Sequence, residues 1–238
     1  MNLLIIGGSQ GLGHALAKGL QPIVTNLFIL SRSQPQVLQQ DPAFPARWIQ
    51  ADLRTPDFVT VLRQALHNTP LDVLIYNAGV WEPDAFMPTY DFATTSPAQI
   101  SDLIQVNLTS AILSVQALLP NLGLPPSAQI ILIGSSSGLD NNQSRAVAYQ
   151  ASKFGLRGLN NALRENLRGT TIRCSLLNLG DLSTRIAYEA GVSGVQQAVG
   201  YSLIPVQDVV SVVRCLCELT PASLIKELDL VGIMDQAV

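Results

Sequence analysis

Short apolar runs of strand length alternate with segments of helical period along the chain, and this alternation most constrains the fold. We expect strands at Asn2–Ile6, Leu27–Leu30, Arg47–Gln50, Val73–Tyr76, Ile130–Ile133, Thr171–Leu177 and Leu228–Val231. Between them, segments such as 58–66 and 104–119 carry apolar residues three and four positions apart, as amphipathic helices do. Because the runs are almost continuously apolar, the strands should be buried on both faces by helices. The sequence therefore predicts a doubly wound α/β fold with a parallel sheet of about seven strands.

The size and charge of the chain narrow its class. Its 238 residues are expected to form one domain over residues 1–238. With 47% hydrophobic and 13% charged residues, the composition is that of a globular protein and not of a disordered chain. The formal net charge is -3, and no run of like charges is long enough to follow a phosphate backbone. Nucleic acid is therefore not an expected partner.

The cysteines and the first apolar run indicate the compartment. Cys174, Cys215 and Cys217 are too few and too clustered for a disulfide framework, and a C-x-C pair lacks the spacing of a zinc site, so no metal is expected. The first apolar run stops at Gly7, too early for a signal peptide, and no stretch looks long enough to span a membrane. The sequence thus predicts a cytoplasmic protein without a membrane partner.

A glycine-rich turn separates the first strand from a helix-prone segment at 14–20. Glycine is needed where the backbone turns tightly and where a side chain would collide with a pyrophosphate bound at the helix N-terminus. A purely structural turn is the alternative, because a glycine-rich turn alone is weak evidence. The spacing here is G-x-x-x-G-x-G. The residues expected to contact a dinucleotide phosphate are Gly7, Ser9, Gln10, Gly11, Leu12 and Gly13.

The end of the second run indicates which dinucleotide is bound. It reads Ser31-Arg32-Ser33 and contains no acidic residue that would bind the ribose hydroxyls of NAD. A guanidinium at this place pairs with the 2′-phosphate of NADP. The sequence therefore favours NADP(H) over NAD(H), and the alternative is that Arg32 is a solvated surface arginine.

Tyr149 and Lys153 are four residues apart, so they share one face of a helix. A phenol is a poor acid–base catalyst at neutral pH until a nearby ammonium favours its phenolate. The spacing is common by chance, but here it follows the fifth strand and a turn of three serines, residues 135–137. Asn107 stands upstream in a predicted helix, where asparagine is intrinsically poor. Together these residues indicate a catalytic group.

These motifs, in this order, resemble the short-chain dehydrogenase/reductase family. The glycine turn matches the family's opening signature, with Ile6 where threonine is usual. Residues 76–79 resemble its Asn-Asn-Ala-Gly motif, and residues 179–184 resemble its Pro-Gly-x-x-x-Thr motif, with Leu179 where proline is usual. The resemblance extends from the first strand to the last.

The resemblance implies a role for each catalytic residue. A serine holds the substrate carbonyl oxygen, Tyr149 exchanges the proton, and Lys153 binds the nicotinamide ribose and lowers the pKa of Tyr149. Asn107 would hold a water that links Lys153 to solvent. Counting from Gly138 selects Ser135 as the serine, whereas counting thirteen residues back from the tyrosine selects Ser136. We prefer Ser135, because the end of a strand is less tolerant of insertion than the loop that follows.

The resemblance also implies further cofactor contacts. Asp52 would bind the adenine amino group, or alternatively cap a helix that begins near residues 55–58. Asn77 would chiefly stabilise the sheet. Thr184 would contact the nicotinamide end, or alternatively cap a helix. The complete set of these contacts is Ala51, Asp52, Leu53, Asn77, Ala78, Gly79, Tyr149, Lys153, Gly180 and Thr184.

The function expected from these features is an NADPH-dependent carbonyl reductase, or the reverse alcohol dehydrogenase, acting on a small organic substrate. The alternative is a dinucleotide-binding sensor or scaffold without turnover. Residues 186–202 form either a substrate lid or an ordinary surface helix. Helices at Leu103–Leu119 and Lys153–Leu167 carry apolar residues around much of their circumference, which predicts a homodimer or homotetramer. The residues expected to line the substrate pocket are Trp81, Leu139, Val147, Tyr188 and Tyr201.

Overall fold

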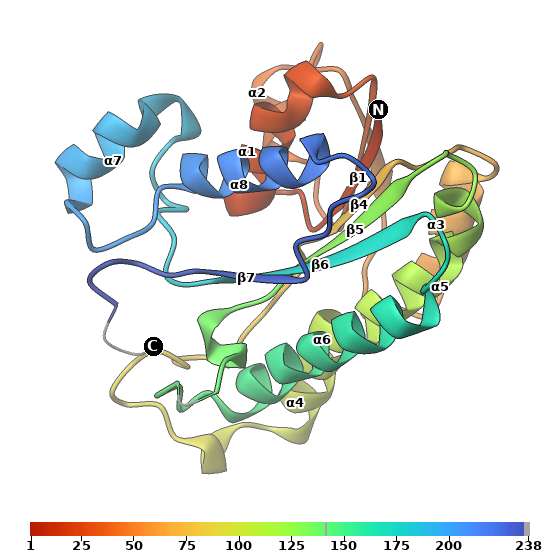
Figure 1. Ribbon diagram of the computed structural model, residues 1–238. Helices are drawn as coiled ribbons and strands as arrows, with labels where there is room; N and C mark the ends of the chain where they lie inside the picture. Colours follow the sequence, from red (N-terminus) through yellow and green to blue (C-terminus); the bar gives the residue numbers. More distant parts are fainter. Residues whose placement is uncertain (141, 236–238) are drawn as a thin grey trace.

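A parallel sheet of seven strands forms the centre of the molecule (Figure 1). The computed structural model describes residues 1–140 and 142–235. In the order β3-β2-β1-β4-β5-β6-β7, every neighbouring pair is parallel. The strands are β1 (Asn2–Ile6), β2 (Asn26–Ser31), β3 (Ala46–Gln50), β4 (Val73–Tyr76), β5 (Ala128–Ile133), β6 (Ile172–Leu179) and β7 (Glu227–Leu230). The predicted doubly wound fold is confirmed, and the predicted strand ends are within two residues of those observed.

Helices cover both faces of this sheet, which explains why its strands are apolar without alternation (Figure 1). The α-helices are α1 (Gly11–Leu20), α2 (Gln36–Gln40), α3 (Phe58–Leu66), α4 (Pro97–Ile104), α5 (Ser110–Leu122), α6 (Val147–Asn166), α7 (Gly191–Val199) and α8 (Val206–Glu218). Short turns are η1 (Gln21–Ile23), η2 (Phe92–Thr94), η3 (Gln105–Thr109), η4 (Ser136–Gly138) and η5 (Tyr188–Ala190). One buried cluster joins the sheet to α3, α5 and α6, and another joins it to α1 and α8.

The strand order leaves a crevice at the carboxyl ends of β1 and β4. The chain leaves β1 toward β2 and leaves β4 toward β5, so the loops after these adjacent strands diverge. Such a switch point is where open α/β sheets bind ligands. Asn77 donates its backbone N–H to the Ile6 carbonyl at 2.9 Å, which holds the two strand ends together at this point.

Residues 186–202, which the sequence predicts to be either a substrate lid or a surface helix, contain the helix α7. Gly191 and Gly200, at the start of α7 and just after its end, have φ values of +64° and +60°. Such backbone angles favour glycine over residues with a Cβ atom. These two glycines therefore mark the two ends of α7.

The continuous helical segment Pro97–Leu122 is long and apolar enough to cross a membrane by length and composition alone. The expectation that no stretch reaches that length is therefore wrong. Half of its most apolar window is buried inside the molecule. Leu103, Ala111, Val115 and Leu118 are among its buried side chains, and the last three belong to the cluster that packs against the sheet. This is the burial expected of a core helix.

Candidate functional site

A cavity of about 680 Å³ lies at the carboxyl ends of the strands. The loops after β1, β2, β3, β4, β5 and β6 all contribute to it. Of the residues predicted from sequence, the cavity brings together Gly7, Ser9, Gln10, Gly11, Leu12, Ser31, Arg32, Ala51, Asp52, Leu53, Asn77, Ala78, Gly79, Ser135, Ser136, Tyr149, Lys153, Gly180 and Thr184. Gly13 and Asn107 do not line it.

The glycine turn is packed too closely for side chains. Gly7 has φ +89°, and a Cβ atom there would lie 2.5 Å from the backbone nitrogen of Ala78. A Cβ atom on Gly13 would lie 2.3 Å from the Gly7 carbonyl oxygen, so Gly13 lets α1 approach the turn although it does not line the cavity. Asn77 Nδ2 donates to the same carbonyl oxygen at 2.7 Å. Asn77 thus links the glycine turn to the end of β4. Ile6, the residue before the turn, is fully buried.

The beginning of α1 suits a pyrophosphate. Gln10 is the N-cap residue, its side chain caps no backbone N–H, and the first turn carries no acidic residue. The first amides of a helix have no partner within the helix, and together they favour a bound anion. This donor set and the close glycine backbone therefore fit a dinucleotide phosphate.

The far end of the cavity carries Ser31, Arg32 and Asp52. The Ser31 hydroxyl donates to the Ser33 carbonyl at 2.7 Å, and Arg32 is exposed. In the part of the chain that the structure describes, no carboxylate forms an ion pair with Arg32. Asp52 Oδ1 accepts the backbone N–H of Arg54 at 3.0 Å, and α3 begins only at Phe58. The alternative that Asp52 caps this helix is therefore wrong.

Tyr149 and Lys153 lie on the face of α6 that borders the cavity. The Lys153 ammonium is 5.5 Å from the centre of the Tyr149 ring and donates to the Ile133 carbonyl at 3.1 Å. Lys153 is 5% exposed, and burial lowers its pKa to about 8. Burial raises the pKa of Tyr149, a hydrogen bond with Ser135 opposes that rise, and the charges of Asp181 and Glu82 add to it.

Ser135 is the serine that contacts the tyrosine. Its side chain interacts with that of Tyr149 and thereby lowers the pKa of the tyrosine, and its hydroxyl oxygen accepts the backbone N–H of Ser137 at 3.1 Å. Ser136, in the short turn η4, lines the cavity without a hydrogen bond to Tyr149. Of the two registers left open by the sequence, this interaction with Tyr149 favours Ser135.

Asn107 fixes the loop after β4. It lies in the π-helical turn η3, an irregularity frequent at functional sites. Its Oδ1 accepts the Val80 N–H at 2.8 Å, and its Nδ2 donates to the Val80 carbonyl at 2.7 Å and to Ser152 Oγ at 3.0 Å. A Cβ atom on Gly79 would lie 3.6 Å from Lys153 Nζ and 3.9 Å from Asn107 Oδ1. Asn107 and Lys153 therefore face the same backbone position.

Two aromatic side chains form a wall beside the tyrosine. Trp81 and Phe86 are 59% and 58% exposed, and their ring centres lie 6.4 and 5.8 Å from that of Tyr149. Sequence reasoning named Trp81 and missed Phe86, because Phe86 lies in a loop that has no periodic pattern. Asp181 and Arg185 of the loop after β6 also line the cavity and were also missed.

Four of the five residues predicted to line the substrate pocket do not line this cavity: Leu139, Val147, Tyr188 and Tyr201. Leu139 is buried, and Tyr201 points into solvent with 69% exposure. Tyr188 packs between α1 and α8, close to Gly19 and Val210. The alternative that Thr184 caps a helix is also wrong, since the next helical element begins at Tyr188.

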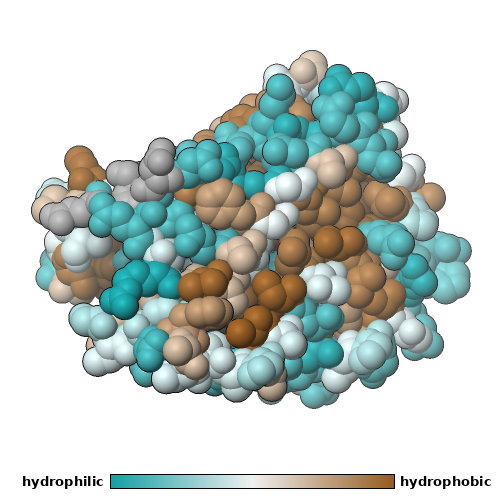
Figure 2. Space-filling model, turned by 90° about the horizontal axis from the view of Figure 1, so that it is seen from below, coloured by the Kyte–Doolittle hydropathy of each residue, from teal (hydrophilic) through white to brown (hydrophobic). Residues whose placement is uncertain are grey.

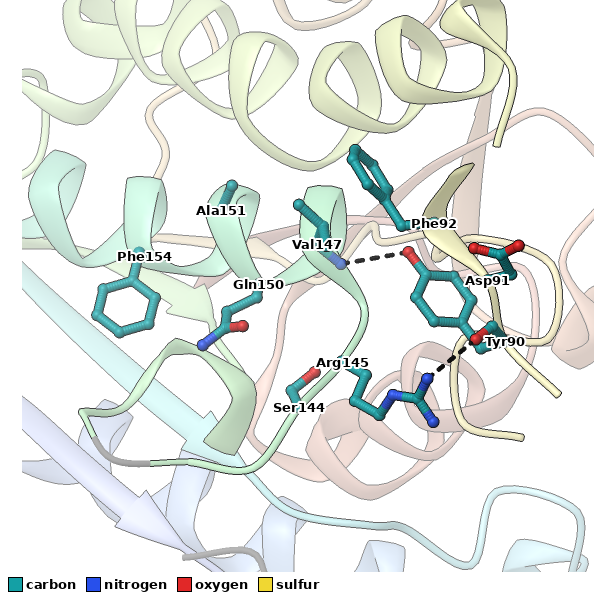
Figure 3. Close-up of a pocket in the computed structure, with 9 residues that line it drawn as sticks. All are labelled: Tyr90, Asp91, Phe92, Ser144, Arg145, Val147, Gln150, Ala151 and Phe154. Carbon is teal, nitrogen blue, oxygen red and sulfur yellow. Dashed lines mark hydrogen bonds between the residues drawn. The ribbon is translucent and has the colours of Figure 1, made fainter. Parts of the chain in front are cut away.

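Val147 instead lines a second pocket, of about 740 Å³, on the outer side of α6. Figure 3 shows this pocket between the first half of α6 and the segment that precedes α4. It is lined by Tyr90, Asp91, Phe92, Ser144, Arg145, Val147, Gln150, Ala151 and Phe154. None of these residues lines the cavity that contains Tyr149.

The chain belongs to the short-chain dehydrogenase family, whose model matches residues 1–192. It is similar to 3-dehydrosphinganine reductase TSC10B of Arabidopsis thaliana, with 32% identity over 77% of this chain and 55% of that protein. It is also similar to the rhamnolipids biosynthesis 3-oxoacyl-(acyl-carrier-protein) reductase of Pseudomonas aeruginosa, with 30% identity over 77% of this chain and 73% of that protein.

Among solved structures, a metagenomic short-chain oxidoreductase in complex with NADP matches with 27% identity and a TM-score of 0.75, over 98% of both chains. The family model and this structural match agree in the fold and in the family to which they assign the chain. This chain spans little more than half the length of the Arabidopsis relative.

Proposed function

We propose that this protein is an NADPH-dependent oxidoreductase that transfers a hydride between nicotinamide and the carbonyl or alcohol carbon of a small organic substrate. The observation that carries the proposal is the cavity itself. Tyr149, Ser135 and Lys153 meet at one end of it, and the glycine turn and Arg32 line the rest. Two relatives are named reductases, and one similar structure is described as a complex with NADP; both facts support the proposed function.

The residues divide the chemistry in a simple way. The nicotinamide, when bound, supplies or accepts the hydride. Ser135 holds the substrate oxygen beside the Tyr149 hydroxyl, which gives that oxygen its proton during reduction. Lys153, with a pKa of about 8, carries its charge at neutral pH and favours loss of the tyrosine proton. The Lys153 ammonium has three N–H donors and uses one of them for the Ile133 carbonyl, so the others can bind a ribose.

The wall of Trp81 and Phe86 favours ketones that carry an apolar or aromatic group beside the carbonyl. A panel of such ketones, mixed with NADPH, tests the function by the loss of NADPH absorbance. We expect turnover with at least one member. If NADPH binds and no carbonyl compound is reduced and no alcohol oxidised, the proposal is wrong and the non-catalytic sensor takes its place.

Arg32→Ala should weaken NADPH binding by about tenfold to a hundredfold, because a charge-assisted contact to the 2′-phosphate contributes ~1.5–3 kcal/mol. The affinity for NADH should stay unchanged. Titration of both cofactors measures this, and Arg47→Ala, an exposed arginine outside the cavity, removes the same charge as a control. Equal binding of NADH and NADPH by the unaltered protein would contradict the role of Arg32.

The outer face of α5 and α6 is apolar where it meets solvent. Figure 2, seen from the side of α4, α5 and α6, shows hydrophobic side chains gathered in bands on this face. Phe92, Ile112, Val147 and Phe154 are each at least 36% exposed. Exposed apolar clusters of this kind mark interaction sites. We propose that a second copy of the chain covers this face in a homodimer or homotetramer.

Light scattering at micromolar concentration should therefore give at least the mass of a dimer. Phe154→Glu should shift the population toward monomer, because a carboxylate would be buried without a partner in the interface. Val192→Glu, which adds the same charge to an exposed position of α7, should leave the mass unchanged. A monomeric parent protein would refute the assembly.

A further inference from the structure

The first turn of α6, which carries Tyr149, is capped by residues from another part of the chain. Ala146 is its N-cap residue and has no side-chain acceptor, and the regular helical bonds begin with Gln150 N–H to the Ala146 carbonyl. The three preceding amides need other partners. Val147 donates to the Tyr90 hydroxyl at 3.4 Å, which Figure 3 shows as a dashed line.

Glu82, in the loop after β4, receives the other two amides. Its Oε1 accepts the N–H of Ala148 at 2.7 Å and that of Tyr149 at 3.3 Å, and it also accepts the Tyr90 hydroxyl at 3.3 Å. The loop that supplies Glu82 is itself held by the two bonds between Asn107 and the Val80 backbone. One carboxylate oxygen thus joins this loop to the helix at the tyrosine.

Glu82 is only 1% exposed, and its Oε2 is buried with no hydrogen-bond partner among the residues described. Burying a carboxylate is costly, although the positive end of a helix offsets part of the cost. A serine or asparagine at position 146 would cap the same turn without a buried charge. Capping alone therefore does not account for a glutamate at this place.

We propose that Glu82 is a positioning residue for Tyr149, and that its buried carboxylate fixes the first turn of α6 and places a negative charge beside the tyrosine. The inference rests on the proposed function of Tyr149. Trp81 is the neighbour of Glu82 in sequence, so the same contact also fixes the aromatic wall relative to the tyrosine hydroxyl.

The charge of Glu82 acts among a small number of groups. Lys153 of α6 faces the Tyr149 ring, and Asp181 faces it from the loop after β6. On the side of Glu82 the neighbour is Tyr90, whose hydroxyl donates to the Glu82 carboxylate. The Arg145 guanidinium in turn donates to the Tyr90 carbonyl oxygen at 3.3 Å. Both carboxylates raise the pKa of Tyr149, so removal of the Glu82 charge should lower that pKa.

Glu82→Gln tests this, because the side-chain amide keeps an oxygen for the two helix amides and loses the charge. The pH at which Tyr149 loses its proton should fall by about half a pH unit or more. A spectroscopic pH titration measures this value from the tyrosinate absorbance, and the part of the signal due to Tyr149 is the part that Tyr149→Phe abolishes. The acid limb of the pH profile of kcat/KM for alcohol oxidation gives a second measurement. Asp84→Asn, an exposed carboxylate of the same loop, should change neither.

Glu82→Ala removes the cap as well, and we expect kcat to fall at least ~10-fold with an unchanged Kd for NADPH, because the hydroxyl is no longer held in place. If the pH profile and the tyrosinate titration of Glu82→Gln coincide with those of the unaltered protein, Glu82 is only a structural cap and the proposal is overturned. Should Glu82→Ala not fold, the glutamine variant decides alone. Should the unaltered protein reduce no ketone, the proposed function fails, and the tyrosinate titration still tests Glu82.

Discussion

Tyr149→Phe should lower kcat by ~10²–10⁴, the contribution of a positioned acid–base group, and leave the Kd for NADPH unchanged. The substitution removes only the hydroxyl, and the ring keeps its contacts with Trp81 and Phe86. Steady-state kinetics on a ketone found by the screen give kcat, and a fluorescence titration gives the Kd.

Tyr201→Phe is the matched control, since it removes a hydroxyl from a tyrosine that is 69% exposed and outside the cavity. It should retain full turnover. Full turnover in Tyr149→Phe would place the proton transfer on another group. It would also remove the observation on which the proposed function rests.

The architecture could be predicted because its signal is local. A strand buried on both faces must be apolar at consecutive positions, so β4 and β5 can be recognised without knowledge of their partners. The ends of these strands then locate the loops that meet at the switch point, which is why most of the predicted residues line the cavity. The glycine turn and Asn77 needed only their position after a strand.

Contacts between distant segments could not be predicted in the same way. Glu82 and the amides it binds are 66 and 67 residues apart, and a lone glutamate in a loop resembles a solvated one. The choice between Ser135 and Ser136 likewise depends on which hydroxyl reaches Tyr149 in space.

One error could have been avoided from helix geometry. Val147 and Tyr149 are two residues apart, and at 3.6 residues per turn this is a rotation of about 200°. The two side chains therefore lie on nearly opposite faces of α6, so a helix that presents Tyr149 to the cavity presents Val147 to the outer pocket.

Lys153→Met should damage cofactor binding and turnover together. It removes the ammonium that favours the tyrosine phenolate and the donor proposed for the nicotinamide ribose, and it keeps a side chain of similar length. We expect at least ~10-fold weaker NADPH binding and a fall of ~10²-fold or more in kcat at saturating cofactor. Calorimetric titration and single-turnover kinetics separate the two effects.

The same variant should be more stable than the unaltered protein when no cofactor is bound. Burial lowers the pKa of Lys153 from 10.5 to about 8, so below pH 8 folding buries a charge that the unfolded chain keeps in water. At neutral pH this burial lowers the free energy of unfolding by about 3 kcal/mol. Between pH 8 and 10.5 the unfolded chain holds a proton on Lys153 that the folded chain has lost, so the free energy of unfolding rises with pH and the cost disappears. Urea unfolding at pH 7 should therefore show a higher free energy of unfolding for Lys153→Met, and the difference should shrink at pH 9.

Lys18→Met is the control. It removes a partly exposed partner of Glu189 and should change the free energy of unfolding by less than about 1 kcal/mol. A loss of stability in Lys153→Met at pH 7 would mean that the ammonium supports the fold, whereas a gain would show that its burial is a cost retained for the reaction.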